Sequence, residues 1–170
     1  MKTPGDVAAW MSLGALCAVS ACASTPPPRS QESPLLSRVR PSFYGETLSN
    51  TAFASDQAKG HKMIVKFFSS KCARCSNTVT AVERIRVDDS SIVVVGVAEE
   101  ASAPDVRVFV NQRGLHFPVL LDGNGSIARD YHVTEVPTTF VISSNGSVSW
   151  VGGPEQTEEG IRAALAAATD

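Results

Sequence analysis

The feature that most constrains this chain is a pair of cysteines, Cys72 and Cys75, which lies between two patterned segments. The run before them, residues 63–68, is rich in β-branched and aromatic residues, which is typical of a buried strand. After them, apolar residues recur at three-residue spacing from Val79 to Ile85, which predicts a helix starting around Cys72. Two thiols on the first turn of a helix share one face and can approach disulfide geometry. We therefore predict a strand, a redox-capable dithiol and a helix in succession.

Redox chemistry explains this pair better than stabilisation does, because a disulfide that closes so short a loop restrains little chain entropy. Of the four cysteines, Cys17 and Cys22 belong to an N-terminal segment of the export type, so Cys72 and Cys75 can pair only with each other or with a partner. Half of a zinc site is the alternative. A closed zinc site needs four ligands, and the remaining histidines show no repeated spacing. We predict no metal and no cofactor.

The surroundings of the dithiol predict which cysteine attacks. A helix N-terminus stabilises a thiolate, and Lys71 and Arg74 add positive charge beside it. Such settings lower a cysteine pKa from about 8.5 to between about 3.5 and 7.5. Cys72, which is nearer the end of the helix, is the expected nucleophile, and Cys75 the expected resolving cysteine.

The following segments predict further strands and helices. Residues 92–97 form a second apolar run that looks like a central strand, and a helix is indicated between Ser102, a possible N-cap, and Gly114, which ends it. The order strand, helix, strand, helix implies parallel pairing. A short strand at 117–121 and a short helix at 127–131 follow.

The last third of the chain predicts a hairpin and a closing helix. Two strand-like runs, 138–142 and 147–151, flank Asn145-Gly146, which is a strong hairpin signal. An alanine-rich helix is expected over 158–168. These elements predict one α/β domain with a central mixed β-sheet flanked by helices on both faces. The 170-residue length suits a single domain.

The N-terminal segment has the pattern of a signal peptide: weak positive charge, a short apolar run over 10–19 and small residues around Cys22. The apolar run is shorter than the roughly 20 residues of a membrane-spanning helix. We divide the chain into a signal peptide at 1–21, a tether rich in Pro and Ser at 22–40 and a domain at 41–170.

Residues 19–22, Val-Ser-Ala-Cys, resemble the lipobox of bacterial lipoproteins. The resemblance implies that Cys22 is lipidated and becomes the first residue of the mature chain. The implied location is the bacterial cell envelope, with the domain held on a membrane and facing the periplasm or the exterior. The alternative is an ordinary signal peptide cut near Ala21 or Ala23, in which Cys22 has no role.

Three landmarks resemble the thioredoxin superfamily and, within it, the TlpA-like branch of membrane-tethered oxidoreductases. They are the strand that leads into Cys72 and Cys75, the segment 114–122 and the segment 136–140, Val-Pro-Thr-Thr-Phe. The resemblance covers about 41–165. It implies the thioredoxin fold and disulfide exchange with partner proteins in the envelope, including a redox partner that recycles the dithiol.

The same resemblance implies that Pro137 is a cis-proline facing the dithiol, and that Val136 offers backbone groups to an extended substrate chain. The sequence alone leaves open a simple proline at the start of a strand.

The chain departs from the family at several positions. Lys66 stands where thioredoxin has a buried acid that helps to move a proton to or from the second thiol. Two positions are open for the Lys66 side chain. Either it is buried, where it loses its proton or pairs with a thiolate, or it is directed to solvent. Thr78 replaces the glutamate of reductases that serve cytochrome c maturation, which puts that role in doubt. The charges of Lys66, Lys71 and Arg74 predict a reduction potential less negative than thioredoxin's, about −270 mV.

Other functions remain as alternatives. Residues 93–122 also resemble peroxiredoxins, although Val65 stands where their motif has a proline, so a thiol peroxidase is the second enzymatic hypothesis. A redox-sensing binding module without catalysis is the third. The net charge of −2 and the scattered Lys and Arg residues argue against a nucleic-acid partner. Packing is the default role for His116, Tyr131, His132 and Trp150.

Overall fold

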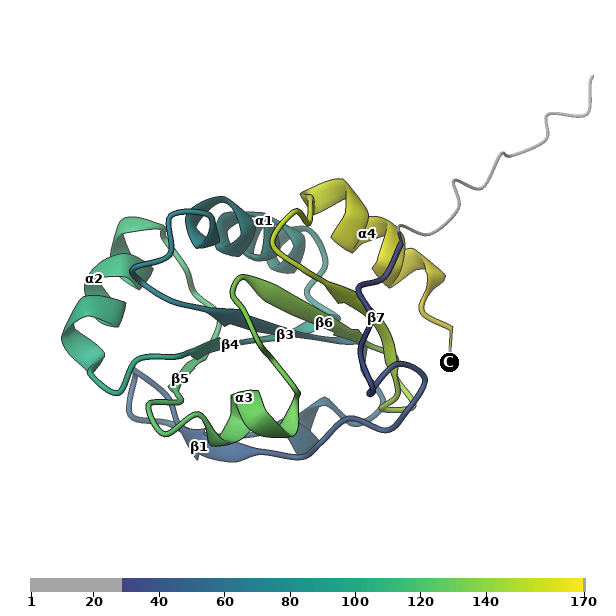
Figure 1. Ribbon diagram of the computed structural model, residues 1–170, viewed down its shortest axis with the longest axis horizontal. Coiled ribbons are helices and arrows are strands. Elements are labelled where there is room, and N and C mark those ends of the chain that lie inside the picture. Colours follow the sequence, from purple (N-terminus) through teal and green to yellow (C-terminus); the bar gives the residue numbers. More distant parts are fainter. Residues whose placement is uncertain (1–28, 170) are drawn as a thin grey trace, which may run out of the picture.

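A five-stranded mixed sheet forms the centre of the protein (Figure 1). The computed structural model describes residues 29–169. The strands lie in the order β5-β4-β3-β6-β7, with β3, β4 and β5 parallel and with β6 and β7 antiparallel to their neighbours. Their bounds are β3 Met63–Phe68, β4 Val93–Ala98, β5 Val119–Leu121, β6 Thr138–Ile142 and β7 Val148–Gly152. The predicted mixed α/β sheet is confirmed.

Helices cover both faces of this sheet, as predicted (Figure 1). On one face lie α1, α2 and α4, and on the other lie α3 and the short 3-10 helix η1. The bounds are η1 Ser55–Ala58, α1 Cys75–Asp88, α2 Ala103–Gln112, α3 Ser126–Asp130 and α4 Glu158–Ala167. The predicted helix start at Cys72 is wrong by three residues, because Cys72 lies in the turn ahead of α1.

The alternation of side chains along β3 divides the core into two layers. Ile64 and Phe68 pack beneath α1, α2 and α4, together with Cys75. Met63, Val65 and Phe67 pack on the other side, where Phe67 and Tyr131 belong to a group of contacting rings. Because β3 is central and covered on both faces, every one of its six side chains is buried.

The N-terminal part of the domain differs from the expectation of a tether up to residue 40. Gln31 N donates to Val151 O at 2.7 Å, and Ser37 N donates to Val148 O at 2.8 Å, so this segment runs along the outer side of β7. An uncovered edge strand would leave backbone groups unpaired, and residues 30–40 cover it. The domain therefore begins near residue 30 rather than at Pro41. The predicted signal peptide, the tether up to residue 28 and Cys22 lie outside the described residues.

A small antiparallel pair, β1 (Tyr44–Glu46) and β2 (Ala52–Ala54), was not among the sequence expectations. It leads into η1 and joins the main sheet through a bridge from Thr47 to Leu120. Phe43, which precedes β1, and Phe53, which lies in β2, bury their rings in the core layer that contains Tyr131.

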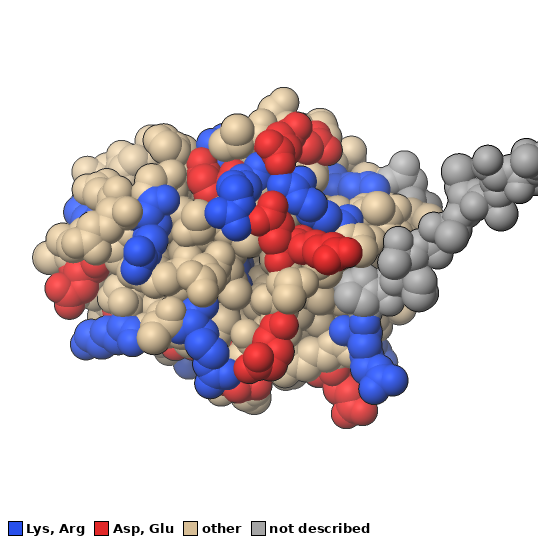
Figure 2. Space-filling model, turned by 90° about the horizontal axis from the view of Figure 1, so that it is seen from above, with Lys and Arg blue, Asp and Glu red and all other residues tan. Residues whose placement is uncertain are grey.

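The outer surface of α1 and α4 carries acidic and basic side chains close together (Figure 2). Arg84 pairs with Glu158 across the two helices, and Arg162 bonds both Glu158 and Asp88. The alternation of sign gives this face no excess of positive charge. Within residues 29–169, no helix has the length and apolar character needed to cross a membrane.

Candidate functional site

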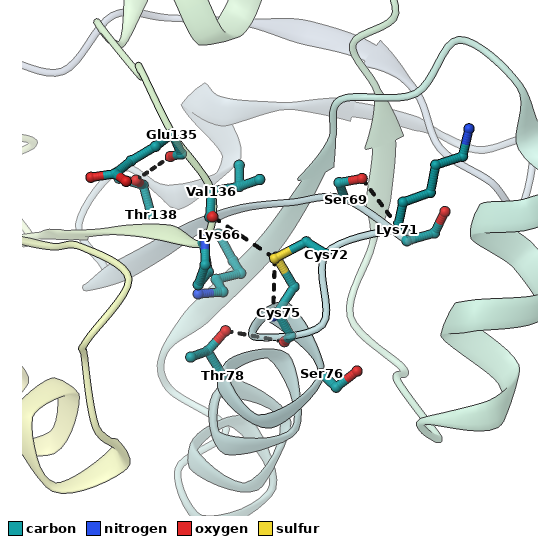
Figure 3. The surroundings of a disulfide bond; sticks show 12 residues. Lys66, Ser69, Lys71, Cys72, Cys75, Ser76, Thr78, Glu135, Val136 and Thr138 are labelled. Carbon is teal, nitrogen blue, oxygen red and sulfur yellow. Dashed lines mark hydrogen bonds between the residues drawn. A yellow bond between two sulfur atoms is a disulfide. The ribbon is translucent and has the colours of Figure 1, made fainter.

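Cys72 and Cys75 form a disulfide at the N-terminus of α1 (Figure 3). The two Cα atoms are 5.3 Å apart. The amide of Cys75 points back at the first cysteine, and its nitrogen lies 3.1 Å from Cys72 Sγ. Cys72 is half-buried, whereas Cys75 is fully buried. The two sulfur atoms therefore differ in access, and Cys72 belongs to the more exposed residue of the two.

Glu100 holds the turn between β3 and the disulfide. This residue follows β4, and one of its carboxylate oxygens, Oε1, accepts hydrogen bonds from Ser69 Oγ at 2.8 Å, Ser70 N at 2.5 Å and Ser70 Oγ at 2.8 Å. Burial raises the pKa of Glu100, but the hydrogen bonds from Ser69 and Ser70 outweigh it and bring the pKa below its ordinary value of 4.5. The carboxylate therefore stays ionised and fixes the turn at neutral pH.

Val136 faces the disulfide from the loop ahead of β6 (Figure 3), and Pro137 is the next residue along the chain. The peptide bond between them is cis, and the Val136 carbonyl oxygen lies 3.8 Å from Cys72 Sγ. Pro137 is buried and Val136 is half-buried. The structure thus brings this predicted pair beside the dithiol, as expected.

The loop between β7 and α4 supports the Val136–Pro137 segment. Gln156 Nε2 donates to Pro137 O at 3.1 Å, and also to Gly152 O and Gly153 O at 3.3 and 2.8 Å. The neighbouring residue, Glu155, forms an exposed ion pair with Arg74, which lies between the two cysteines; Glu155 Oε1 and Arg74 Nη1 are 3.0 Å apart. This loop therefore contacts both sides of the site.

Lys66 is buried and does not point to solvent. Its side chain has no exposed surface and lies on the face of β3 that α1 covers. Its amine donates to Thr139 Oγ1 at 3.0 Å, and among residues 29–169 no carboxylate pairs with it. Burial without a counter-charge lowers the pKa of Lys66 well below its ordinary value of 10.5. Of the two positions left open by the sequence, buried or directed to solvent, Lys66 takes the buried one.

The remaining predicted residues have different surroundings. Lys71 is exposed, and Thr78 is buried with its hydroxyl donating to Cys75 O at 3.1 Å. Tyr131 and Trp150 are core residues, as expected, whereas the His116 side chain is 74% exposed. In the described part of the chain, no three His, Cys, Asp or Glu side chains are grouped so that they could hold a metal ion.

Two supporting residues escaped the sequence analysis, Glu100 and Gln156. Each acts across a long sequence interval, 30 residues from Glu100 to Ser70 and 19 residues from Gln156 to Pro137. A polar residue after a strand is common in any α/β chain, so the sequence carried no specific signal for either one.

Comparison with known proteins identifies a family and several relatives to which this chain is similar. Residues 37–166 match the Redoxin family. The chain is 32% identical over 112 residues to the thioredoxin-like protein YneN of Bacillus subtilis, covering 64% of this chain and 65% of that protein. It is 28% identical over 95 residues to sporulation thiol-disulfide oxidoreductase A of the same organism, covering 53% and 58%. The matched region thus spans less than two thirds of either relative.

Solved structures agree with the fold. A thiol:disulfide interchange protein of the thioredoxin family from Chlorobium tepidum superposes with a TM-score of 0.68 and 26% identity, over 76% of this chain and 94% of that one. The thioredoxin fold implied by the sequence resemblance is confirmed.

Proposed function

Because this chain belongs to the Redoxin family, we propose that it is a thiol:disulfide oxidoreductase that exchanges disulfides with partner proteins through Cys72 and Cys75. One observation carries the proposal: the two cysteines form a disulfide at a helix N-terminus, and the half-buried Cys72 faces a backbone carbonyl of Val136. The names of the relatives, which include thiol-disulfide oxidoreductases, support the same activity.

The difference in burial between the two cysteines supports a separate role for each. The Cys72 thiolate attacks a partner disulfide, one partner sulfur leaves as thiolate, and a mixed disulfide forms. Cys75 then attacks Cys72 Sγ, which closes the internal disulfide and releases the second partner sulfur. Two electrons pass to the partner. Oxidation of a partner dithiol follows the same steps in reverse.

The partner chain has a place to bind beside the dithiol. We assign substrate contact to the backbone of Val136 and Pro137, because the Val136 carbonyl faces Cys72 and Gln156 donates a hydrogen bond to the carbonyl of Pro137. An extended peptide placed there brings its sulfur to the accessible cysteine. A protein thiol or disulfide suits this open arrangement.

The surrounding charges contribute unequally to thiolate stabilisation. Arg74 shares its charge with Glu155, and an exposed pair of this kind contributes little. The buried position of Lys66 favours its neutral form. The expectation of a potential less negative than thioredoxin's, about −270 mV, therefore rests mainly on the helix N-terminus and on Lys71.

The location belongs to the proposal as well. The lipobox-like residues 19–22 support lipidation of Cys22, and the cell envelope is the compartment in which that modification places a bacterial protein. Labelled fatty acid should enter the full-length protein and should be absent from the Cys22→Ala variant. Equal labelling of the wild type and Cys22→Ala would contradict lipidation at Cys22, and it would leave the proposed disulfide exchange unaffected.

A trapping experiment tests the exchange mechanism. In Cys75→Ala, the mixed disulfide with Cys72 cannot resolve, so we expect disulfide-linked complexes with envelope proteins after affinity capture. The matched control is Cys72→Ala with Cys75→Ala, which should yield none. Capture of no linked partner by Cys75→Ala would contradict the mechanism.

Activity assays on the wild type and on Cys75→Ala distinguish the oxidoreductase from the two alternatives, a binding module and a thiol peroxidase. A binding module predicts negligible disulfide reduction and little effect of Cys75→Ala. A thiol peroxidase predicts rapid consumption of peroxide by Cys72, whereas the oxidoreductase is expected to react with disulfides far faster than with peroxide.

A further inference from the structure

Lys66 is a buried charged residue that disulfide exchange alone does not require. The other buried charged side chains in the described part of the chain have clear partners: Arg40 bonds Ser55, Glu83 bonds Arg86, and Asp122 bonds the first amides of α3. The amine of Lys66 bonds one neutral hydroxyl, that of Thr139. A buried amine with so few partners is costly, which suggests a function.

The strand register places the Lys66 side chain on the face of the sheet that α1 covers. Lys66 pairs with Gly96 on one side and with Thr139 on the other. Its side chain leaves the sheet on the face shared with Ile64 and Phe68, where Cys75 is also packed. Figure 3 shows Lys66 and Cys75 on the same side of the strand, in the immediate surroundings of the disulfide.

The groups that face this position cannot easily move a proton. Gly96 has no side chain, Thr139 is a hydroxyl, and Thr78 of α1 bonds the carbonyl of Cys75. The buried residues of α4 are Ile161, Ala164 and Leu165. Other charged groups near the site are only partly buried or exposed: Lys71, the pair Arg74–Glu155, Glu135 beside Val136, and Glu99 with Glu100 after β4.

Cys75 has a proton that must leave during the second step of exchange. It is fully buried, so bulk water does not reach its thiol directly. A neutral amine has a lone pair and accepts a proton readily, which a charged amine cannot do. We propose that Lys66 is the proton acceptor of Cys75, directly or through one water molecule, during closure of the disulfide. The proposal rests on the exchange function proposed above.

The Cys75 thiol gives its proton to Lys66 Nζ, which becomes an ammonium, and the Cys75 thiolate attacks Cys72 Sγ of the mixed disulfide. The S–S bond to the partner breaks, and its electron pair leaves on the partner thiolate. That thiolate then takes up a proton, and Lys66 returns its own to solvent or to the partner. Reduction of the internal disulfide runs the same steps backwards.

Closure kinetics test the proposal. Reduced full-length protein with Cys17 and Cys22 replaced by Ala is mixed with oxidised glutathione, quenched with acid and analysed by mass spectrometry, which resolves glutathione addition at Cys72 from its later loss. In Lys66→Met we expect loss to slow at least tenfold at pH 7 and to recover as pH rises, because hydroxide then removes the thiol proton. Addition should change less than threefold. The matched control, Lys59→Met, removes an exposed lysine outside the site and should leave both steps unchanged.

A second measurement isolates the thiol itself. With Cys17, Cys22 and Cys72 all replaced by Ala, thiolate absorbance near 240 nm reports Cys75 alone. Adding Lys66→Met to this protein should reduce the thiolate fraction at pH 7 at least tenfold. Lys66→Gln replaces Lys66→Met if the latter does not fold. Unchanged closure with an unchanged pH profile would overturn the proposal, as would equal slowing of both steps. Absence of any glutathione exchange in the wild type would instead contradict the proposed function.

Discussion

Glu100 offers a sharp test of how the protein positions its dithiol turn. Glu100→Ala removes the oxygen that accepts three hydrogen bonds from Ser69 and Ser70. Hydrogen bonds to charged groups contribute about 1.5–3 kcal/mol each, but this turn is half-buried and its hydroxyls regain water. We expect a net loss of about 2 kcal/mol in the free energy of unfolding. For a domain of this size, the melting temperature should fall by about 6 °C.

The pH dependence follows from the lowered pKa of Glu100. A carboxyl group whose pKa falls on folding stabilises the protein above its unfolded pKa, and the contribution is lost as pH drops through the folded value. Glu100→Gln keeps an acceptor oxygen without the charge. The free energy of unfolding of Glu100→Gln should be lower than that of the wild type at pH 7, and this difference should shrink as pH falls below 4.5. Thermal unfolding of the oxidised proteins across this range measures the difference.

Glu99 provides the matched control, because it lies next to Glu100 and behaves in the opposite way. Burial, together with the charges of Glu100 and Asp122, raises the pKa of Glu99 above its ordinary value of 4.5. Glu99→Gln should therefore leave stability at pH 7 unchanged or slightly increased. The reasoning is refuted if Glu100→Gln and Glu100→Ala both unfold at the wild-type temperature at pH 7.

Three further predictions follow from the geometry of the site and its core. In the reduced protein, iodoacetamide should label the half-buried Cys72 at least tenfold faster than the buried Cys75, as peptide mass spectrometry can show; equal rates would contradict the assigned roles. Gln156→Ala removes the donor to the carbonyl of Pro137 and should raise KM for a protein disulfide more than it lowers kcat. Tyr131→Phe should cost about 1 kcal/mol at pH 7, the contribution of one neutral hydrogen bond. Burial raises the pKa of the Tyr131 hydroxyl, so wild-type stability should fall above about pH 10, and this alkaline loss should be smaller in the variant.

The central fold was predictable because its signals are local. The apolar run that became β3, the spacing that became α1 and the Asn-Gly turn between β6 and β7 each occupy a few adjacent residues. The short pair β1 and β2 has no such signal, since three-residue strands carry too little periodicity to stand out.

The N-terminal segment was harder to predict because composition and tertiary packing point in different directions. Its Pro and Ser residues are typical of a tether, yet Leu35 and Leu36 pack against the core and the backbone covers β7. The need to cover an edge strand arises only once the sheet is assembled, so no local pattern reports it.

Part of the site could be inferred more fully from the sequence than it was. The expectation that residues 63–68 form a central strand already implies burial of Lys66, since both faces of such a strand are covered. Glu100 and Gln156 are different, because their roles depend on loops that meet only in the folded protein.

Insulin reduction with dithiothreitol as electron donor is the most direct assay for disulfide exchange by this protein. The wild type should accelerate reduction well above the rate with dithiothreitol alone. Cys72→Ala should abolish the acceleration, and Cys75→Ala should nearly do so because its mixed disulfides accumulate. A wild-type rate equal to that of the variant lacking both cysteines would contradict the account.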